Sequence, residues 1–102
     1  MADSRKDLYS LTYDAKIDID EIFDYGEGRF GLDQALEYFL GLESLFEQLT
    51  TFPFEGILRD DIGHNIQSIP FGSHLVFYSV TKNAILIIRV LHQSQNVKDY
   101  FE

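Results

Sequence analysis

Two of the three histidines, His74 and His92, are the residues whose type and spacing first suggest chemistry. Each falls in a segment with strand character, and neighbouring strands could place the two imidazoles side by side as metal ligands. No carboxylate and no third histidine lies near either residue in the sequence, so a full ligand set is not evident. The pattern therefore predicts hydrogen-bonding strand residues and no metal site. The chain has no cysteine, which excludes disulfides, thiolate zinc sites and thiol catalysis.

A group of acidic residues could act as paired carboxylates or as a cation site. Its members are Asp18, Asp20, Glu21 and Asp24. Because apolar residues recur at helical spacing in the same segment, we interpret this charge run as the solvated face of an amphipathic helix. Arg59, followed by Asp60 and Asp61, has two open interpretations: ion pairing or capping within a turn, or a place on the rim of a binding surface.

The elements that position these residues follow from the apolar spacing. A strand is expected over residues 8–12, and the Thr12 hydroxyl is expected to cap a first helix. The glycines at 26, 28 and 31 are expected to break this helix and form a turn. A second helix is expected over residues 32–49, because apolar side chains recur at alternating steps of four and three. The segment 52–56 contains a proline and ends this helix.

The second part of the chain has strand character. Strands are expected over residues 65–69, 73–80 and 84–92, and their short connections require an antiparallel meander. The fold class is therefore α+β, with the order β-α-α-β-β-β and an antiparallel sheet that carries a helical hairpin on one face. We expect a single domain over residues 1–102, with a flexible leader at 1–7 and a C-terminal tail at 93–102.

The last of these strands is apolar on both faces. Alternation separates Ile85, Ile87 and Leu91 on one face from Leu86, Ile88 and Val90 on the other. A strand with one solvated face should instead alternate apolar with polar residues. Two explanations are open: the tail closes the second face, or that face is a docking groove for a partner chain. The residues of the tail that could close it are Val97, Tyr100 and Phe101.

The formal net charge of the chain is −9, and it is unevenly distributed. Residues 1–61 contain 15 acidic and 5 basic side chains, whereas residues 62–102 contain 2 acidic and 3 basic ones. Such acidity argues against a nucleic-acid-binding protein, which presents a basic surface. No apolar run approaches the roughly 20 residues of a membrane span, and no secretory signal is evident. We therefore expect a soluble, cytoplasmic protein.

Several short motifs, in order along nearly the whole chain, resemble one family. The strongest are SIPFGSHLVFY at residues 68–78 and IRVLHQS at residues 88–94. Weaker ones are Leu11-Thr12 before the acidic first helix, Phe30-Gly31 with Gln34-Ala35, and Arg59-Asp60-Asp61-Ile62. Taken together, these motifs resemble the ParE-type toxins of the RelE/ParE superfamily.

The resemblance implies the toxin of a type II toxin–antitoxin system, with a ParD-like antitoxin as its partner. It also implies inhibition of DNA gyrase, without enzymatic activity and without a cofactor. The RelE branch instead cleaves messenger RNA on the ribosome, with Arg and Lys on the sheet and a tyrosine near the C-terminus. Here His92, Gln93 and Gln95 stand where those nucleases carry basic residues, although Tyr100 lies near the place of their tyrosine. The sequence therefore favours gyrase inhibition, with no direct nucleic-acid binding.

A third interpretation is a homologue with weak or lost toxicity that acts through its antitoxin complex. Many ParE-type toxins carry a basic residue at each of two places that hold Ile57 and Gln67 here. If binding of gyrase uses those cations, this member lacks part of the surface that it needs.

Two sets of site residues result. The candidates for binding the target are Arg59, His74, Tyr78, Arg89, His92 and Gln93. The candidates for binding the antitoxin are Ile85, Ile87, Leu91, Phe39 and Phe46. Tyr78 could equally be a core residue with its hydroxyl at the edge. Because the segment 14–47 is so acidic, we expect the antitoxin segment that crosses it to be apolar with Lys or Arg at its edges.

Overall fold

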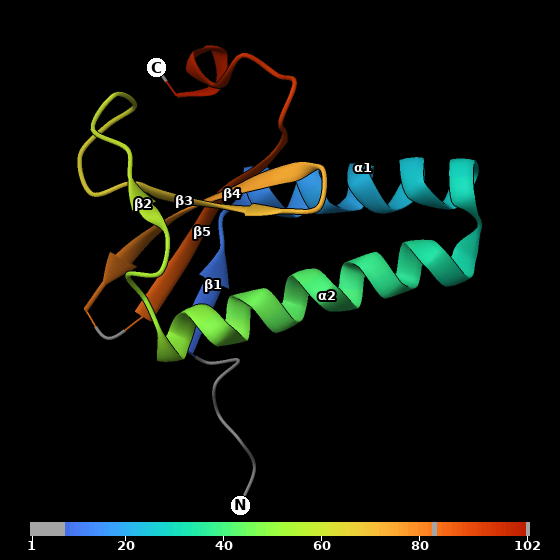
Figure 1. Ribbon diagram of the computed structural model, residues 1–102, viewed down its shortest axis with the longest axis horizontal. Coiled ribbons are helices and arrows are strands. Elements are labelled where there is room, and N and C mark those ends of the chain that lie inside the picture. Colours follow the sequence, from blue (N-terminus) through green and yellow to red (C-terminus); the bar gives the residue numbers. More distant parts are fainter. Residues whose placement is uncertain (1–7, 83, 102) are drawn as a thin grey trace, which may run out of the picture.

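The computed structural model describes residues 8–82 and 84–101, and it has two layers (Figure 1). One layer is a five-stranded sheet, and the other is a hairpin of two long helices whose far end extends beyond the sheet. In chain order the elements are β1 (Tyr9–Leu11), α1 (Tyr13–Phe30), α2 (Leu32–Thr51), β2 (Ile57–Leu58), β3 (Gln67–Phe71), β4 (His74–Thr81), β5 (Ala84–His92) and the 3₁₀-helix η2 (Val97–Tyr100). The expected α+β class with a helical hairpin is confirmed. The expected leader at 1–7 lies outside the described residues.

The sheet has the strand order β1-β5-β4-β3-β2 and is mixed. β3, β4 and β5 form the expected antiparallel meander. β1, however, pairs with β5 in parallel, from Tyr9 opposite Ile85 to Leu11 opposite Ile87. The expectation of a wholly antiparallel sheet is therefore wrong for β1, because the intervening helices and meander return the chain in the same direction. β2 is an additional edge strand of 2 residues, too short to leave a periodic pattern in the sequence.

The first helix is longer than the sequence indicates, because it continues through Gly26 and Gly28 to Phe30. The expected turn over all three glycines is therefore wrong. Gly31 makes the turn, with a φ of 93° that favours glycine. At Gly26 a Cβ would lie 3.6 Å from the Cβ of Ala35, an ordinary van der Waals distance, so the packing of the two helices does not require a glycine there. No helix among the described residues is long and apolar enough to cross a membrane.

Thr12 joins β1 to α1 and confirms the expected cap. Its hydroxyl oxygen accepts a hydrogen bond of 3.0 Å from the Ala15 amide and donates one of 2.7 Å to the Ile88 carbonyl. Its own backbone amide donates to the Ile87 carbonyl at 3.0 Å. The residue therefore caps the helix and also continues the hydrogen bonding of β5 where β1 ends.

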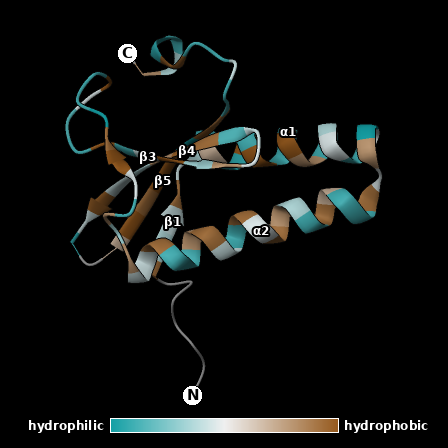
Figure 2. Ribbon diagram, viewed as in Figure 1, coloured by the Kyte–Doolittle hydropathy of each residue, from teal (hydrophilic) through white to brown (hydrophobic). Residues whose placement is uncertain are grey.

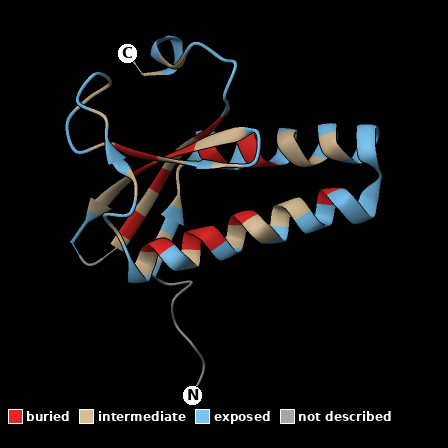
Figure 3. Cartoon of the chain, viewed as in Figure 1, coloured by how far each residue is buried: buried red, intermediate tan, exposed pale blue. Residues whose placement is uncertain are grey.

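The core lies between the hairpin and the sheet. Figure 3 shows buried residues along β4 and β5 and on the parts of α1 and α2 that face them, whereas the far end of the hairpin is exposed. Figure 2 shows the matching division in hydropathy, with apolar strands and helices of mixed character. The main buried contributors are Ala15, Ile19, Leu42, Phe46 and Leu49 from the helices and Val76, Tyr78, Ile85, Ile87 and Val90 from the sheet. Removal of this apolar surface from water is the main contribution that stabilises the fold.

A β-bulge in β5 changes which of its side chains face the core. Phe77 of β4 lies opposite Arg89, but the next residue, Tyr78, lies opposite Ile87. Ile88 is therefore an extra residue without an opposite partner. Beyond this point the alternation of β5 is shifted by one residue.

The shift corrects the expected faces of the strand. Val90 joins the core cluster beside the helices, opposite Val76. Leu91, the next residue, points to the other face, because successive side chains of a strand alternate. The expectation that Leu91 shares a face with Ile85 and Ile87 is therefore wrong.

The C-terminal tail covers part of the second face of the sheet. Phe77 is fully buried although it points away from the core cluster, and the ring of Phe101 packs on it at 5.0 Å. The ring centre of Tyr100 lies 5.1 Å from the guanidinium carbon of Arg89. The tail therefore closes this face around Phe77 and Arg89, whereas Leu86 and Ile88 of β5 remain only half-buried.

Candidate functional site

An open groove of about 620 Å³ lies between the helical hairpin and one end of the sheet. The helices line it with apolar side chains, among them Ile22, Phe23, Ala35, Phe39 and Leu42. The ends of β4 and β5 and the tail line it with polar side chains, among them Ser73, His74, Arg89, His92, Gln95 and Tyr100. A groove of this size can accept several side chains of a partner, and its polar rim can orient them.

His74 and His92 lie directly opposite each other on β4 and β5, side by side as the sequence suggested. Their ring centres are 5.4 Å apart, and the ring planes are nearly perpendicular, at 83°. The hydroxyl of Tyr38 on α2 lies 2.7 Å from His74 Nδ1, and the hydroxyl of Ser94 lies 2.8 Å from His92 Nδ1. Burial and the neighbouring imidazole lower the pKa of His74, while the charge of Asp18 acts in the opposite direction. His74 is therefore a neutral, hydrogen-bonded residue at pH 7.

Gln93 stabilises the same end of the sheet through its hydrogen bonds. Its side-chain amide donates hydrogen bonds to the Gly72 carbonyl at 3.0 Å and to the His74 carbonyl at 3.3 Å. Its backbone amide donates to the Ser73 carbonyl at 2.9 Å. The structure therefore brings together three of the six target-binding candidates, namely His74, His92 and Gln93. Gln93 is the one whose hydrogen bonds hold the ends of the strands in place.

Arg89 also borders the groove, but its charge is compensated within the chain. Its guanidinium donates two hydrogen bonds of 2.8 Å to the carboxylate of Asp18 on α1. The same carboxylate accepts the Val90 amide at 3.0 Å, beyond the point where β1 ends. Hydrogen bonding to Asp18 raises the pKa of Arg89. Asp18 is only 7% exposed, so its expected place on the solvated face of the helix is wrong.

Arg59 lies beside the edge strand β2 and does not line the groove. Its guanidinium forms an ion pair of 3.0 Å with Asp61 and donates a hydrogen bond of 3.1 Å to the Ser68 hydroxyl. The hydrogen bond from Arg59 lowers the pKa of Asp61. Of the two interpretations of this motif, ion pairing within the turn is the one observed.

Tyr78 is fully buried, which agrees with its alternative interpretation as a core residue. Its hydroxyl oxygen accepts a hydrogen bond of 2.9 Å from the Gly56 amide, and the hydroxyl donates to the Pro53 carbonyl at 3.0 Å. Burial raises the pKa of this hydroxyl. Tyr78 therefore fixes the segment that follows α2 and offers no surface to a partner.

The antitoxin-binding candidates are mostly inside the protein. Four of them, Ile85, Ile87, Leu91 and Phe46, are each at most 2% exposed. These four side chains are therefore not exposed for docking in the isolated chain, and their role in binding the antitoxin stays a prediction. Phe39 is half-buried, lines the groove and packs edge-to-face on Phe23 at 6.3 Å.

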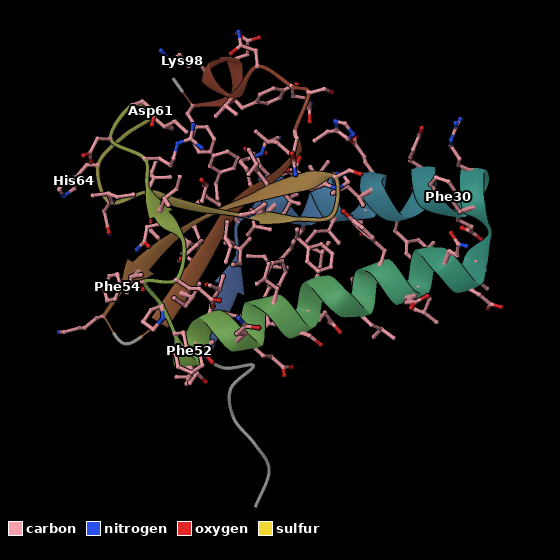
Figure 4. The ribbon with its side chains drawn as sticks, viewed as in Figure 1. Phe30, Phe52, Phe54, Asp61, His64 and Lys98 are labelled. Atoms are coloured by element: carbon pink, nitrogen blue, oxygen red, sulfur yellow. The ribbon has the colours of Figure 1, made fainter. Side chains whose placement is uncertain are left out.

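The structure also exposes large apolar residues that the sequence patterns did not mark. On α2, Leu32, Leu36 and Leu40 are 54%, 44% and 50% exposed. Figure 4 shows Phe30 at the tip of the hairpin and Phe52 and Phe54 pointing outward near the C-terminal end of α2. The regular spacing of the three leucines could have identified a second apolar stripe on this helix, beside the one that faces the core.

A helical hairpin on a five-stranded sheet, with an open and partly apolar groove between them, defines a small α+β protein with a surface suited to binding another protein. A family model described as "ParE toxin of type II toxin-antitoxin system, parDE" matches residues 9–97. The chain belongs to this family of toxins, as the motifs implied.

Individual relatives agree with the family. The chain is 38% identical over 90 residues to Toxin ParE1 of Caulobacter vibrioides, an alignment that covers 88% of this chain and 93% of the relative. It is 34% identical to Toxin ParE1 of Mycobacterium tuberculosis, with 87% of this chain and 92% of the relative covered. The fold is similar to that in a structure titled "Chromosomal ParDE TA system from P. aeruginosa", with a TM-score of 0.70 and 19% identity over 82% of this chain and 92% of that chain.

Proposed function

We propose that this protein inhibits DNA gyrase by binding it in the cytoplasm, without itself catalysing a reaction. Membership of the ParE family supports the proposal. The observation on which it mainly depends is the ion pair between Arg89 and Asp18. Arg89 is the one Lys or Arg among the described residues that line the groove, and its charge is compensated by Asp18. A ribonuclease needs cations that hold the charged phosphate of its substrate. The groove therefore favours a protein target over RNA.

The second candidate is a ribosome-dependent ribonuclease of the RelE type. One observation favours it, since His74, His92 and Tyr100 all line the groove and could transfer protons. These groups would act beside Arg89, whose charge is compensated by Asp18, on a chain with a net charge of −9. Approach to ribosomal RNA would then be opposed by the charge of the protein.

A supercoiling assay with purified gyrase tests the first proposal. We expect the free protein, at concentrations that saturate gyrase, to stop supercoiling, and we expect its antitoxin to restore it. Unchanged supercoiling at saturation would contradict the assignment. Cleaved messenger RNA in a translation extract would support the ribonuclease, and normal growth of cells that express the chain alone would support weak or lost toxicity.

We further propose that the partner antitoxin is ParD-like and that its toxin-binding segment is apolar with Lys or Arg at its edges. The charge of the hairpin supports this chemistry. α2 contains the acidic residues Asp33, Glu37, Glu43 and Glu47 and no Lys or Arg. A uniformly acidic segment laid on this helix would meet like charge, which is costly at an interface.

Binding of the antitoxin should therefore weaken as the salt concentration rises. We expect a Kd about tenfold weaker in high salt than in low salt, because salt screens attraction between exposed opposite charges. The double variant Asp33→Asn with Glu37→Gln should bind more weakly than the wild type at low salt. Asp60→Asn, which removes an exposed charge outside the hairpin, is the matched control. A Kd that is independent of salt and of these residues would refute the proposal.

A further inference from the structure

The proposed inhibition of gyrase requires no chemistry of the two histidines at the end of the groove, yet the fold holds them in a defined arrangement. They occupy opposite positions on β4 and β5. The His92 amide donates to the Gln95 side chain at 2.7 Å, whereas the adjacent Gln93 amide donates across the sheet to Ser73 at 2.9 Å. The histidine pair is therefore at a non-hydrogen-bonded position of the ladder, where opposite side chains approach most closely.

Tyr38 engages His74 through Nδ1, which leaves Nε2 as the nitrogen open to a ligand. The Tyr38 hydroxyl donates to the Phe71 carbonyl at 3.1 Å and accepts the Ser73 amide at 3.2 Å. The same hydroxyl lies 2.7 Å from His74 Nδ1, and its one proton can be directed at the Phe71 carbonyl or at this nitrogen. When the proton is directed at the carbonyl, Nδ1 of neutral His74 carries the ring proton and the lone pair of Nε2 is free for a ligand.

His92 is engaged through the corresponding nitrogen. Its Nδ1 accepts the Ser94 amide at 3.1 Å and lies 2.8 Å from the Ser94 hydroxyl. Nε2 is then the nitrogen that remains available for a ligand. Binding through it requires its proton to move to Nδ1, where the oxygen of the Ser94 hydroxyl can accept the hydrogen bond in place of the amide contact.

The separation of the ring centres agrees with that of two imidazoles bound to one cation. Zinc lies about 2.0–2.1 Å from an imidazole nitrogen, so it lies about 3.2 Å from the ring centre. Two rings bound at a tetrahedral angle then have centres about 5.2 Å apart. The observed separation is 5.4 Å.

We propose that His74 and His92 form a two-ligand site for a divalent transition metal such as Zn²⁺, bound through Nε2 of each ring. Both side chains line the groove, so the remaining coordination positions are open to water or to a carboxylate or imidazole of a bound partner. Among the described residues no three metal-binding side chains converge, and the proposed site uses these two ligands.

The surroundings of the pair resemble the outer shell of a metal site. Metal-bound histidines commonly use their second nitrogen for a hydrogen bond that orients the ring, and Tyr38 and Ser94 provide such partners. Imidazole ligands suit Zn²⁺, Ni²⁺ and Cu²⁺, whereas Mg²⁺ prefers oxygen. The charge of the nearby Arg89 is compensated by Asp18, which reduces its repulsion of a cation.

Titration of the full chain with ZnCl₂, NiCl₂ and MgCl₂ tests this site by calorimetry, with the histidine resonances followed by NMR. We expect one equivalent of Zn²⁺ or Ni²⁺ to bind and to shift the signals of His74 and His92, and we expect no binding of Mg²⁺. His92→Ala should weaken Zn²⁺ binding about tenfold or more, because one of two ligands is lost. His92 is exposed, so this variant should keep the fold, which circular dichroism would verify.

His64→Ala is the matched control, because His64 is also exposed and lies outside the groove. It should leave the Kd for Zn²⁺ unchanged. The proposal is overturned if the wild type binds no Zn²⁺, or if a folded His92→Ala variant binds it as tightly as the wild type. Equal losses in His64→Ala and His92→Ala would likewise overturn it, because they would show diffuse surface binding.

Discussion

Replacing Asp18 with alanine is expected to lower the free energy of unfolding by about 3–5 kcal/mol. The carboxylate makes two hydrogen bonds of 2.8 Å to Arg89 and one of 3.0 Å to the Val90 amide. Its removal leaves a guanidinium that is only 18% exposed, and a buried amide, without their partner. A buried charge that loses its partner is strongly destabilising, more so than the intact pair is stabilising. Chemical denaturation of both proteins would measure the difference.

Asp20→Ala is the matched control for this prediction. Asp20 is an exposed aspartate on the same helix, and its replacement should change the free energy of unfolding by about 0.5 kcal/mol or less. The double variant Asp18→Leu with Arg89→Met should recover part of the loss, because apolar residues of similar size can replace a buried ion pair. An Asp18→Ala variant as stable as Asp20→Ala would show that the pair contributes nothing to the fold.

The burial of Asp18 could not be predicted from the sequence. Asp18, Asp20, Glu21 and Asp24 look alike in the sequence, and an amphipathic helix with such a charge run exposes most of it. What separates Asp18 from the others is Arg89, a partner 71 residues away. Helical spacing carries no information about a contact at that distance.

The elements themselves could be predicted well where the pattern is local. The pattern predicts the last strand over 84–92, and the strand spans Ala84–His92; one hydroxyl before an acidic turn likewise predicts the Thr12 cap. The parallel pairing of β1 and the bulge at Ile88 were not predictable in this way. Both depend on which strands meet, and the bulge alone moved Leu91 to the other face of the sheet.

The candidate site could be predicted only in part for the same reason. The adjacency of His74 and His92 followed from two neighbouring strands and is observed. Arg59 and Tyr78 do not line the groove, because Arg59 pairs with Asp61 and Tyr78 is buried. Residue type indicated that these side chains could bind a target, but their burial and internal partners come only from the packing.

Replacing Phe46 with alanine is the second change with a large expected effect, again about 3–5 kcal/mol of the free energy of unfolding. Phe46 is 2% exposed in the core cluster and packs edge-to-face on Tyr9 at 5.5 Å. Its removal loses the transfer free energy of the ring and leaves a cavity that the long helix and the sheet can close only partly. Thermal and chemical denaturation would both report the loss.

Leu40→Ala is the control for this loss of stability, and the Kd for the antitoxin tests the other expected role of Phe46. Leu40 lies on the same helix and is 50% exposed, so its replacement should cost about 1 kcal/mol or less. If Phe46 acts only from within the core, then Phe46→Ala should bind the antitoxin with the wild-type Kd under conditions in which the variant is folded. A folded Phe46→Ala variant of nearly wild-type stability but with weakened antitoxin binding would reverse the assignment. It would mean that the antitoxin opens the space between α2 and the sheet and that the ring is a contact of the complex.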